Sequence, residues 1–139
     1  MIEINNQIKG DPSGHVDKKL FSAVAKKVLI GENRQTETLS LAFIDKSEIK
    51  KLNKKFRNKN KATDVLSFEL NDKGIIGEIV ICPEIVKENA KKCKVSVKSE
   101  LLKVFVHGIL HLCGYDHEKS KREADEMETK QEKYLSKVK

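Results

Sequence analysis

Three of the chain's four histidines, His107, His111 and His117, lie within eleven consecutive residues. Because four residues make slightly more than one helical turn, His107 and His111 project from one helix face and can bind the same metal ion. Gly114 can then end the helix in a left-handed conformation and turn the chain, which can bring His117 back beside the first two imidazoles. Three protein ligands are typical of catalytic zinc sites, whose open position holds a water with its pKa lowered to about 7. The spacing therefore predicts a hydrolase that binds one Zn2+ per chain.

The same spacing, His-x3-His-x2-Gly-x2-His, occurs in metzincin metalloproteases, where the general-base glutamate follows the first histidine. Gly108 occupies that position here, so a metzincin-like protease matches the ligands but lacks its proton acceptor. A structural zinc site is a further alternative, closed by a fourth ligand from Cys82, Cys113 or Asp116. Cys113 is the poorest of these ligands, because two residues after His111 it points off the shared helix face.

Residues 107–117, with the sequence HGILHLCGYDH, resemble the signature HGxLHLxGYDH of the YbeY family of metal-dependent endoribonucleases, the bacterial rRNA maturation factors. Three further segments, 52–57, 63–68 and 77–81, resemble that family in order and separation. Family members typically carry proline where this chain has Ala62 and often aspartate where it has Glu78. Neither departure alters the histidine ligands.

The resemblance implies a small mixed sheet packed by helices, with a metzincin-like metal site on the central helix and the following turn. It also implies a zinc-dependent, single-strand-specific endoribonuclease that acts in rRNA maturation, at the 3′ end of 16S rRNA, and in ribosome quality control. The implied partners are ribosomal RNA and the small ribosomal subunit. A non-catalytic, metal-stabilised RNA- or ribosome-binding module is the competing class, and a fourth protein ligand on the metal would favour it.

Arg57 and His107 are the predicted catalytic residues. In the family motif the arginine lines the same cleft as the metal, and a guanidinium binds phosphate oxygens bidentately. Without the resemblance, Arg57 would be a surface residue that ends a lysine-rich helix. Glu78, Asp116 and Glu118 are candidates for orienting the ligand histidines or accepting a proton, because histidine ligands commonly donate their second nitrogen to a carboxylate.

The hydrophobic periodicity predicts a mixed α/β fold. Helix 47–56 is expected to begin at Ser47 and to carry Phe56 on its apolar face, and helix 99–112 to be the central, buried one. Tyr115 is expected to close the turn, and base stacking by aromatic residues to be slight. The predicted strands span residues 2–8, 39–44, 65–70 and 78–82, and the predicted helices span 16–30, 47–56, 83–93, 99–112 and 120–135.

Length and composition agree with this interpretation. A chain of 139 residues predicts one domain, residues 1–139, and 28 Lys and Arg against 21 Asp and Glu give a net charge of +7, which favours polyanions such as RNA. Mixed-charge runs on solvated helix faces would give the same balance. Three cysteines without a Cys-x-x-Cys pair predict reduced thiols, and no apolar run is long enough for a membrane span. We therefore expect a cytoplasmic protein with no membrane contact, and a monomer.

Overall fold

Four strands and five helices make up the parts of the chain that the structure, a computed structural model, describes: residues 2–6, 17–72, 74–115 and 120–136. The strands, in the order β1-β2-β4-β3, are β1 (Ile2–Asn6), β2 (Thr38–Phe43), β4 (Ile75–Ile81) and β3 (Val65–Asp72). β1, β2 and β4 run parallel, and β3 pairs antiparallel with β4 at the sheet edge. The helices are α1 (Lys18–Gly31), α2 (Lys46–Arg57), α3 (Pro83–Cys93), α4 (Val97–Leu112) and α5 (Lys121–Ser136).

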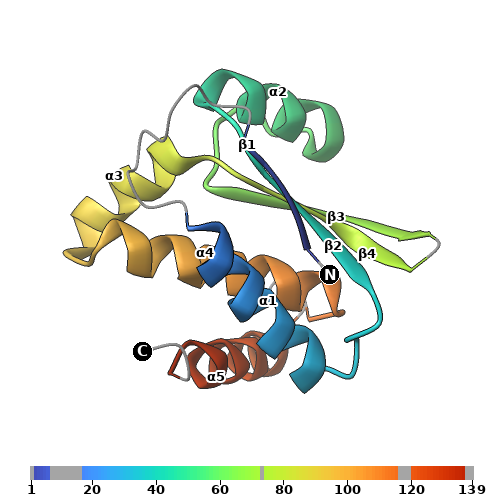
Figure 1. The fold of residues 1–139 in the computed structure, drawn as a ribbon. Helices are drawn as coiled ribbons and strands as arrows, with labels where there is room; N and C mark the ends of the chain where they lie inside the picture. Colours follow the sequence, from blue (N-terminus) through green and yellow to red (C-terminus); the bar gives the residue numbers. More distant parts are fainter. Residues whose placement is uncertain (1, 7–16, 73, 116–119, 137–139) are drawn as a thin grey trace.

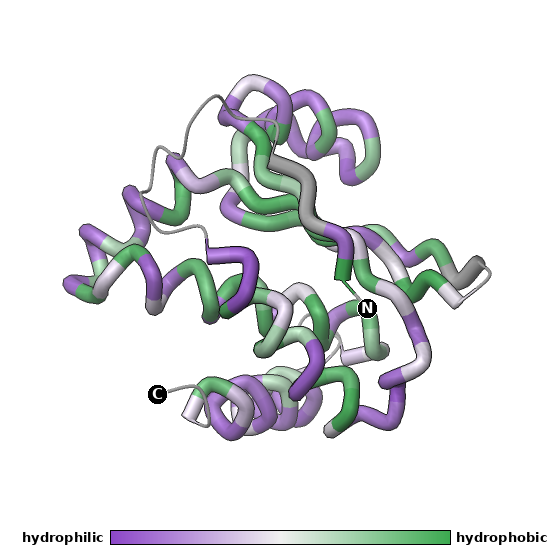
Figure 2. The backbone as a smooth tube through the Cα atoms, in the orientation of Figure 1, coloured by the Kyte–Doolittle hydropathy of each residue, from purple (hydrophilic) through white to green (hydrophobic). Residues whose placement is uncertain are grey.

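The sheet separates two layers of helices (Figure 1). α1, α4 and α5 lie on one face, α2 lies on the other, and α3 follows the end of β4. Alternation along β4 produces this division, because Ile79 and Ile81 pack into the core with α1 and α4, whereas Val80 and Cys82 pack with Ile49 of α2. Hydrophobic residues accordingly predominate on the inner strands, and hydrophilic residues on α2 and α5 (Figure 2). None of the helices in the described ranges is long and apolar enough to cross a bilayer.

The predicted α/β class with a small mixed sheet and five helices is confirmed, and the differences lie at element ends. Asp45 rather than Ser47 caps α2, since its carboxylate accepts the Glu48 N–H at 2.9 Å. Ser96 caps α4, which therefore begins at Val97. β4 begins at Ile75 rather than at 78, because the turn at residue 74 returns the chain immediately into pairing with β3. Residues 7 and 8 of the predicted first strand lie outside the described residues.

α4 packs unusually close to the sheet at two glycines. A β-carbon added at Gly77 of β4 would lie 2.7 Å from Leu112 Cδ2 of α4 and would also press on the Phe68 carbonyl oxygen. One added at Gly108 would lie 3.1 Å from Ser67 Oγ, whose hydroxyl donates to the Gly108 carbonyl at 3.3 Å. The absent side chains therefore set how deeply α4 lies against β3 and β4.

Glu32, which follows α1, links the turn after α4 to α5. The Tyr115 hydroxyl donates to Glu32 Oε1 at 2.9 Å, the Tyr134 hydroxyl donates to Oε2, and Lys130 Nζ lies 3.5 Å from Oε2. Burial alone would raise the pKa of Glu32, but the hydrogen bonds from Tyr134 and Tyr115 and the charge of Lys130 hold it below its ordinary value of 4.5. Burial and the contact with Glu32 raise the pKa of Tyr115 to about 12. Tyr115 thus closes the turn, as expected.

Gly77→Ala should destabilise the fold by about 1–3 kcal/mol, because the added methyl group has no space between β3 and α4. Urea unfolding followed by circular dichroism measures this change. Gly108→Ala should destabilise the fold less, because its neighbours at 3.1–3.2 Å need to move only by a few tenths of an ångström and alanine gains about 1 kcal/mol of helix preference. Equal stability of Gly77→Ala and the parent protein would contradict the close packing.

Tyr115→Phe should lower the free energy of unfolding near neutral pH by roughly 1 kcal/mol, because Glu32 loses one charge-assisted hydrogen bond. The folded-state pKa of Tyr115 is raised, so its contribution is complete below its unfolded value of about 10 and is lost as the pH rises toward about 12. The variant should therefore lose less stability than the parent protein across that window.

Denaturant unfolding at a series of pH values tests this difference. Thr129→Val serves as the control, since it removes an exposed hydroxyl of α5 that donates to the Asp125 carbonyl. If Tyr115→Phe and Thr129→Val give the same profile, the Glu32 contact contributes nothing to stability.

Candidate active site

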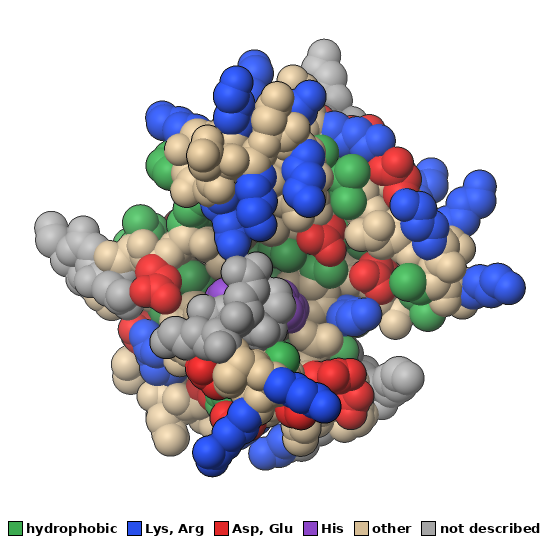
Figure 3. All heavy atoms as spheres, turned by 180° about the vertical axis from the view of Figure 1, so that it is seen from behind, with side chains coloured by type: hydrophobic (Ala, Val, Ile, Leu, Met, Phe, Trp, Pro, Cys, Tyr) green, Lys and Arg blue, Asp and Glu red, His purple; other side chains and the backbone are tan. Residues whose placement is uncertain are grey.

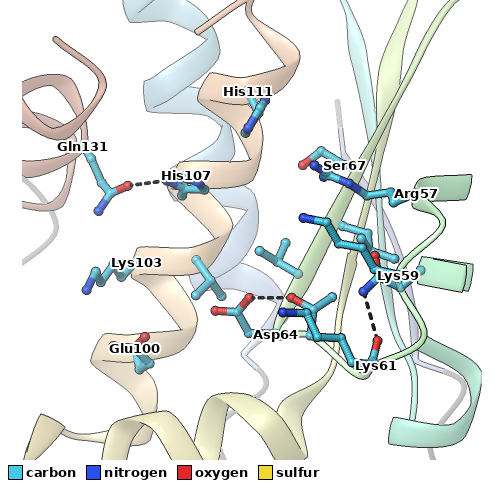
Figure 4. Close-up of a pocket in the computed structure, with 15 residues that line it drawn as sticks. Arg57, Lys59, Lys61, Asp64, Ser67, Glu100, Lys103, His107, His111 and Gln131 are labelled. Atoms are coloured by element: carbon cyan, nitrogen blue, oxygen red, sulfur yellow. Dashed lines mark hydrogen bonds between the residues drawn. The ribbon is translucent and has the colours of Figure 1, made fainter. Parts of the chain in front are cut away.

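A cleft of about 430 Å3 opens between α4 and the segment that joins α2 to β3. Figure 3 shows histidine side chains inside this hollow and lysine and arginine side chains along one rim. Figure 4 shows α4 and α5 on one side of the cleft and the end of α2 with its following loop on the other. Its lining side chains are Asn53, Arg57, Lys59, Lys61, Thr63, Asp64, Val65, Leu66, Ser67, Glu100, Lys103, Val104, His107, His111 and Gln131.

The α4 wall is a polar line on an otherwise apolar helix. Glu100, Lys103, His107 and His111 follow one another at spacings of three or four residues, so they share one helix face. The remaining circumference of α4 is largely buried among the core side chains. This packing leaves the helix almost no freedom to rotate, and it directs the two imidazoles into the cleft.

His107 and His111 are arranged so that they can share one ion. Their ring centroids are 5.7 Å apart, and two imidazoles bound at the usual Zn–N distance of about 2 Å have centroids roughly 5–6 Å apart. His107 Nδ1 lies 3.1 Å from Gln131 Oε1, which can only accept, so the imidazole donates through Nδ1–H. In that tautomer Nε2 is the unprotonated nitrogen, the one that can act as a ligand.

The other predicted site residues do not all meet these histidines. His117, Asp116 and Glu118 lie outside the described residues. Glu78 lies on the α2 face of the sheet, across β4 from α4, where it accepts a hydrogen bond from Ser40 Oγ at 3.1 Å.

The two cysteines proposed as a fourth ligand for a structural zinc site are also elsewhere. Cys82 is buried with Ile49 on the α2 face of the sheet, and Cys113 packs against the main core. Neither lines the cleft, and within the described ranges no cluster of three His, Cys, Asp or Glu side chains is positioned to hold a metal.

The opposite wall is cationic. Arg57 is the last residue of α2, and Figure 4 shows it and Lys59 extending toward the histidine side of the cleft. Asn58 ends the helix in a left-handed conformation, with φ of 55°, and turns the chain back. The buried Asn53 side chain then donates to the Lys61 carbonyl at 2.9 Å, which fixes the returning loop to α2. The backbone of the cationic wall is therefore held in place by the turn at Asn58 and by the Asn53 side chain.

The described lining carries more positive than negative charge. Arg57, Lys59, Lys61 and Lys103 supply four cations, against two carboxylates from Asp64 and Glu100. Asp64 also accepts a hydrogen bond from the Thr63 hydroxyl at 3.3 Å. A polar cleft with excess positive charge suits a polyanion whose phosphate lies between Arg57 and the histidines.

Sequence reasoning missed several of these residues. Glu100 and Lys103 could have been found, since they precede His107 by seven and four residues on the same helix face. Gln131 also left a signal, because it is a polar residue on the face of α5 that buries Met127 and Tyr134. No local pattern marks Lys59 or Lys61, which the turn at Asn58 brings to the cleft.

Comparison with known proteins gives a consistent result. The family model described as Endoribonuclease YbeY matches residues 3–139. The endoribonuclease YbeY of Thermotoga petrophila is 41% identical over 138 residues, which cover 99% of this chain and 89% of that protein. The YbeY of Bdellovibrio bacteriovorus is 50% identical over 102 residues, covering 73% of this chain and 67% of the relative. A solution structure of a Thermotoga maritima protein superposes with a TM-score of 0.71 at 38% identity, covering 99% and 89% of the two chains. The resemblance seen in the histidine segment thus extends over almost the whole chain, which belongs to the YbeY family of endoribonucleases, hydrolases acting on RNA.

Proposed function

We propose that this protein is a zinc-dependent, single-strand-specific endoribonuclease that processes ribosomal RNA, at the 3′ end of 16S rRNA, and acts in ribosome quality control. The observation that carries the proposal is that His107 and His111 face Arg57 across one cationic cleft. Family membership supports the RNA-cleaving class. The small ribosomal subunit is the proposed partner. The three unpaired cysteines fit a reducing compartment such as the cytoplasm.

His107 and His111 would hold the zinc ion together with His117. The residues present fit this role, because Gln131 fixes the tautomer of His107 and the two rings have the separation of a shared ion. When bound there, zinc would act as a Lewis acid on the phosphate and lower the pKa of an attacking water.

The chain's own side chains bind and orient the RNA. Arg57 binds the scissile phosphate through two N–H groups and stabilises the negative charge that develops on the phosphate oxygens. Lys59 on one wall of the cleft and Lys103 on the other add positive charge. Asp64 and Glu100 are the carboxylates in the described lining that can accept a proton from the attacking group. Gly108, buried against Ser67 and Ile79, leaves no place there for a metzincin-type glutamate.

Incubating the zinc-loaded and the chelated protein with ribosomal RNA precursor and mapping the products tests this function. We expect specific cleavage by the loaded protein only. RNA binding without cleavage would instead identify a non-catalytic module, and cleavage of casein would identify a protease.

The purified protein should contain about one zinc per chain, and His111→Ala should lose it, because two imidazoles cannot replace three. Gln131→Leu should keep the fold and weaken zinc affinity by about 10–100-fold, since His107 loses the acceptor that fixes its tautomer. Elemental analysis and competition with a chelating dye measure both effects. His15→Ala, which removes the histidine outside the motif, is the control. Full zinc content in His111→Ala would show that the ligand assignment is wrong.

Arg57→Ala and Arg57→Lys should both reduce RNA cleavage by on the order of a hundredfold, because neither keeps the two-pronged contact with phosphate. Zinc content and melting temperature should change little, since Arg57 is an exposed residue at a helix end. Lys26→Ala removes one exposed positive charge from α1 and controls for net charge. Normal cleavage by folded Arg57→Ala would refute the role.

A further inference from the structure

Phe56 is the exposed aromatic residue of this chain. Its side chain is 56% exposed, whereas Phe21, Phe43, Phe105 and Tyr134 are buried, and Phe68 and Tyr115 are half-buried. The apolar spacing of the sequence predicted that Phe56 would pack inward with Ile49, and this prediction is wrong. α2 ends one residue later, and in this last turn Phe68 of β3 covers only part of the Phe56 ring.

The ring is nonetheless held in a defined place. Phe68 of β3 supports it edge-on, with ring centroids 5.3 Å apart and an interplanar angle of 68°. Lys55 Nζ lies 5.2 Å from the ring centroid. Because the Lys55 side chain is exposed, it can move aside when another planar group stacks on the ring. Its positive charge would then remain close enough to bind an anionic group attached to that planar group. The surface formed by Phe56, Phe68 and Lys55 is therefore an ordered aromatic face with a cation beside it.

This aromatic face lies around the edge of the sheet from the cleft. Consecutive residues of a helix project about 100° apart, so Phe56 points away from the cleft that Arg57 enters. β3 is the outermost strand on this side, and its alternation sends Ser67 to the cleft and Phe68 to the aromatic face. A chain that crosses the β3 edge can contact Arg57 and Phe56 together.

We propose that Phe56 stacks on one nucleobase of a single-stranded RNA whose neighbouring phosphate is bound by Arg57. Charge complementarity favours a nucleic acid as the occupant, because Lys55 lies over this small aromatic face, and Arg57 and Lys59 extend into the cleft from the same helix end and its following loop. Every base has a flat face, so stacking here adds affinity with little sequence preference. A base in a duplex is already stacked between its neighbours, so this site selects unpaired RNA.

The proposal rests on the proposed function for its substrate class, and binding measurements separate the two. We would titrate the full-length protein, with chelator to prevent cleavage, against a fluorescent single-stranded RNA and a duplex of the same sequence. Phe56→Ala and Phe56→Leu should weaken single-strand binding about tenfold, and Phe56→Trp should preserve it. Duplex binding should not change. Ile30→Ala is the matched control, since that side chain is 49% exposed on α1, near β1 at the opposite sheet edge.

A scan of abasic sites along the RNA gives the decisive result. In the parent protein, one abasic position should weaken binding about as much as Phe56→Ala does, and in Phe56→Ala that position should be neutral. Melting temperatures of the variants exclude a folding defect. Parent-like single-strand binding by Phe56→Ala, or an equal loss on duplex RNA, would overturn the proposal, and the first result would leave a protein partner as the occupant. If the parent protein never cleaves RNA but the abasic coupling appears, the stacking site stands and the proposed activity fails.

Discussion

The packing of α4 against β3 and β4 is the constraint on which the rest of the structure depends. This helix is buried around most of its circumference, so its only polar line must lie where the sheet ends and solvent begins. Gly77 and Gly108 allow a close approach that fixes its depth and rotation. The positions of the His107 and His111 imidazoles are therefore well defined, because a helix packed on most of its circumference cannot rotate them out of the cleft.

The two walls of the cleft are built differently. The histidine wall belongs to the core, whereas the cationic wall consists of a helix end and a loop, whose lysines are exposed. The side chain of the buried Asn53 donates a hydrogen bond to the Lys61 carbonyl, and this bond fixes the backbone of the exposed loop. The backbone that carries Lys59 and Lys61 is thus fixed at the cleft.

Helix α5 contributes both to the stability of the fold and to the geometry of the cleft. Gln131 orients His107, and Tyr134, less than one turn later, donates to Glu32. The same carboxylate receives the Tyr115 hydroxyl from the turn after α4. One partly buried carboxylate therefore holds together α1, α5 and the turn after α4, so a change that loosens α5 also disturbs the orientation of His107.

The sequence by itself determined the mixed α/β class, the family, and the two histidines on one helix face, because each depends on local spacing that a helix or strand converts directly into geometry. The tertiary structure alone decided what surrounds them. Lys59 and Lys61 reach the cleft through the left-handed turn at Asn58, and Glu78 lies across the sheet from α4, although local pattern distinguished none of these positions. The exposure of Phe56 depends on how much of its ring Phe68 of β3 covers, which the periodicity of a helix does not encode.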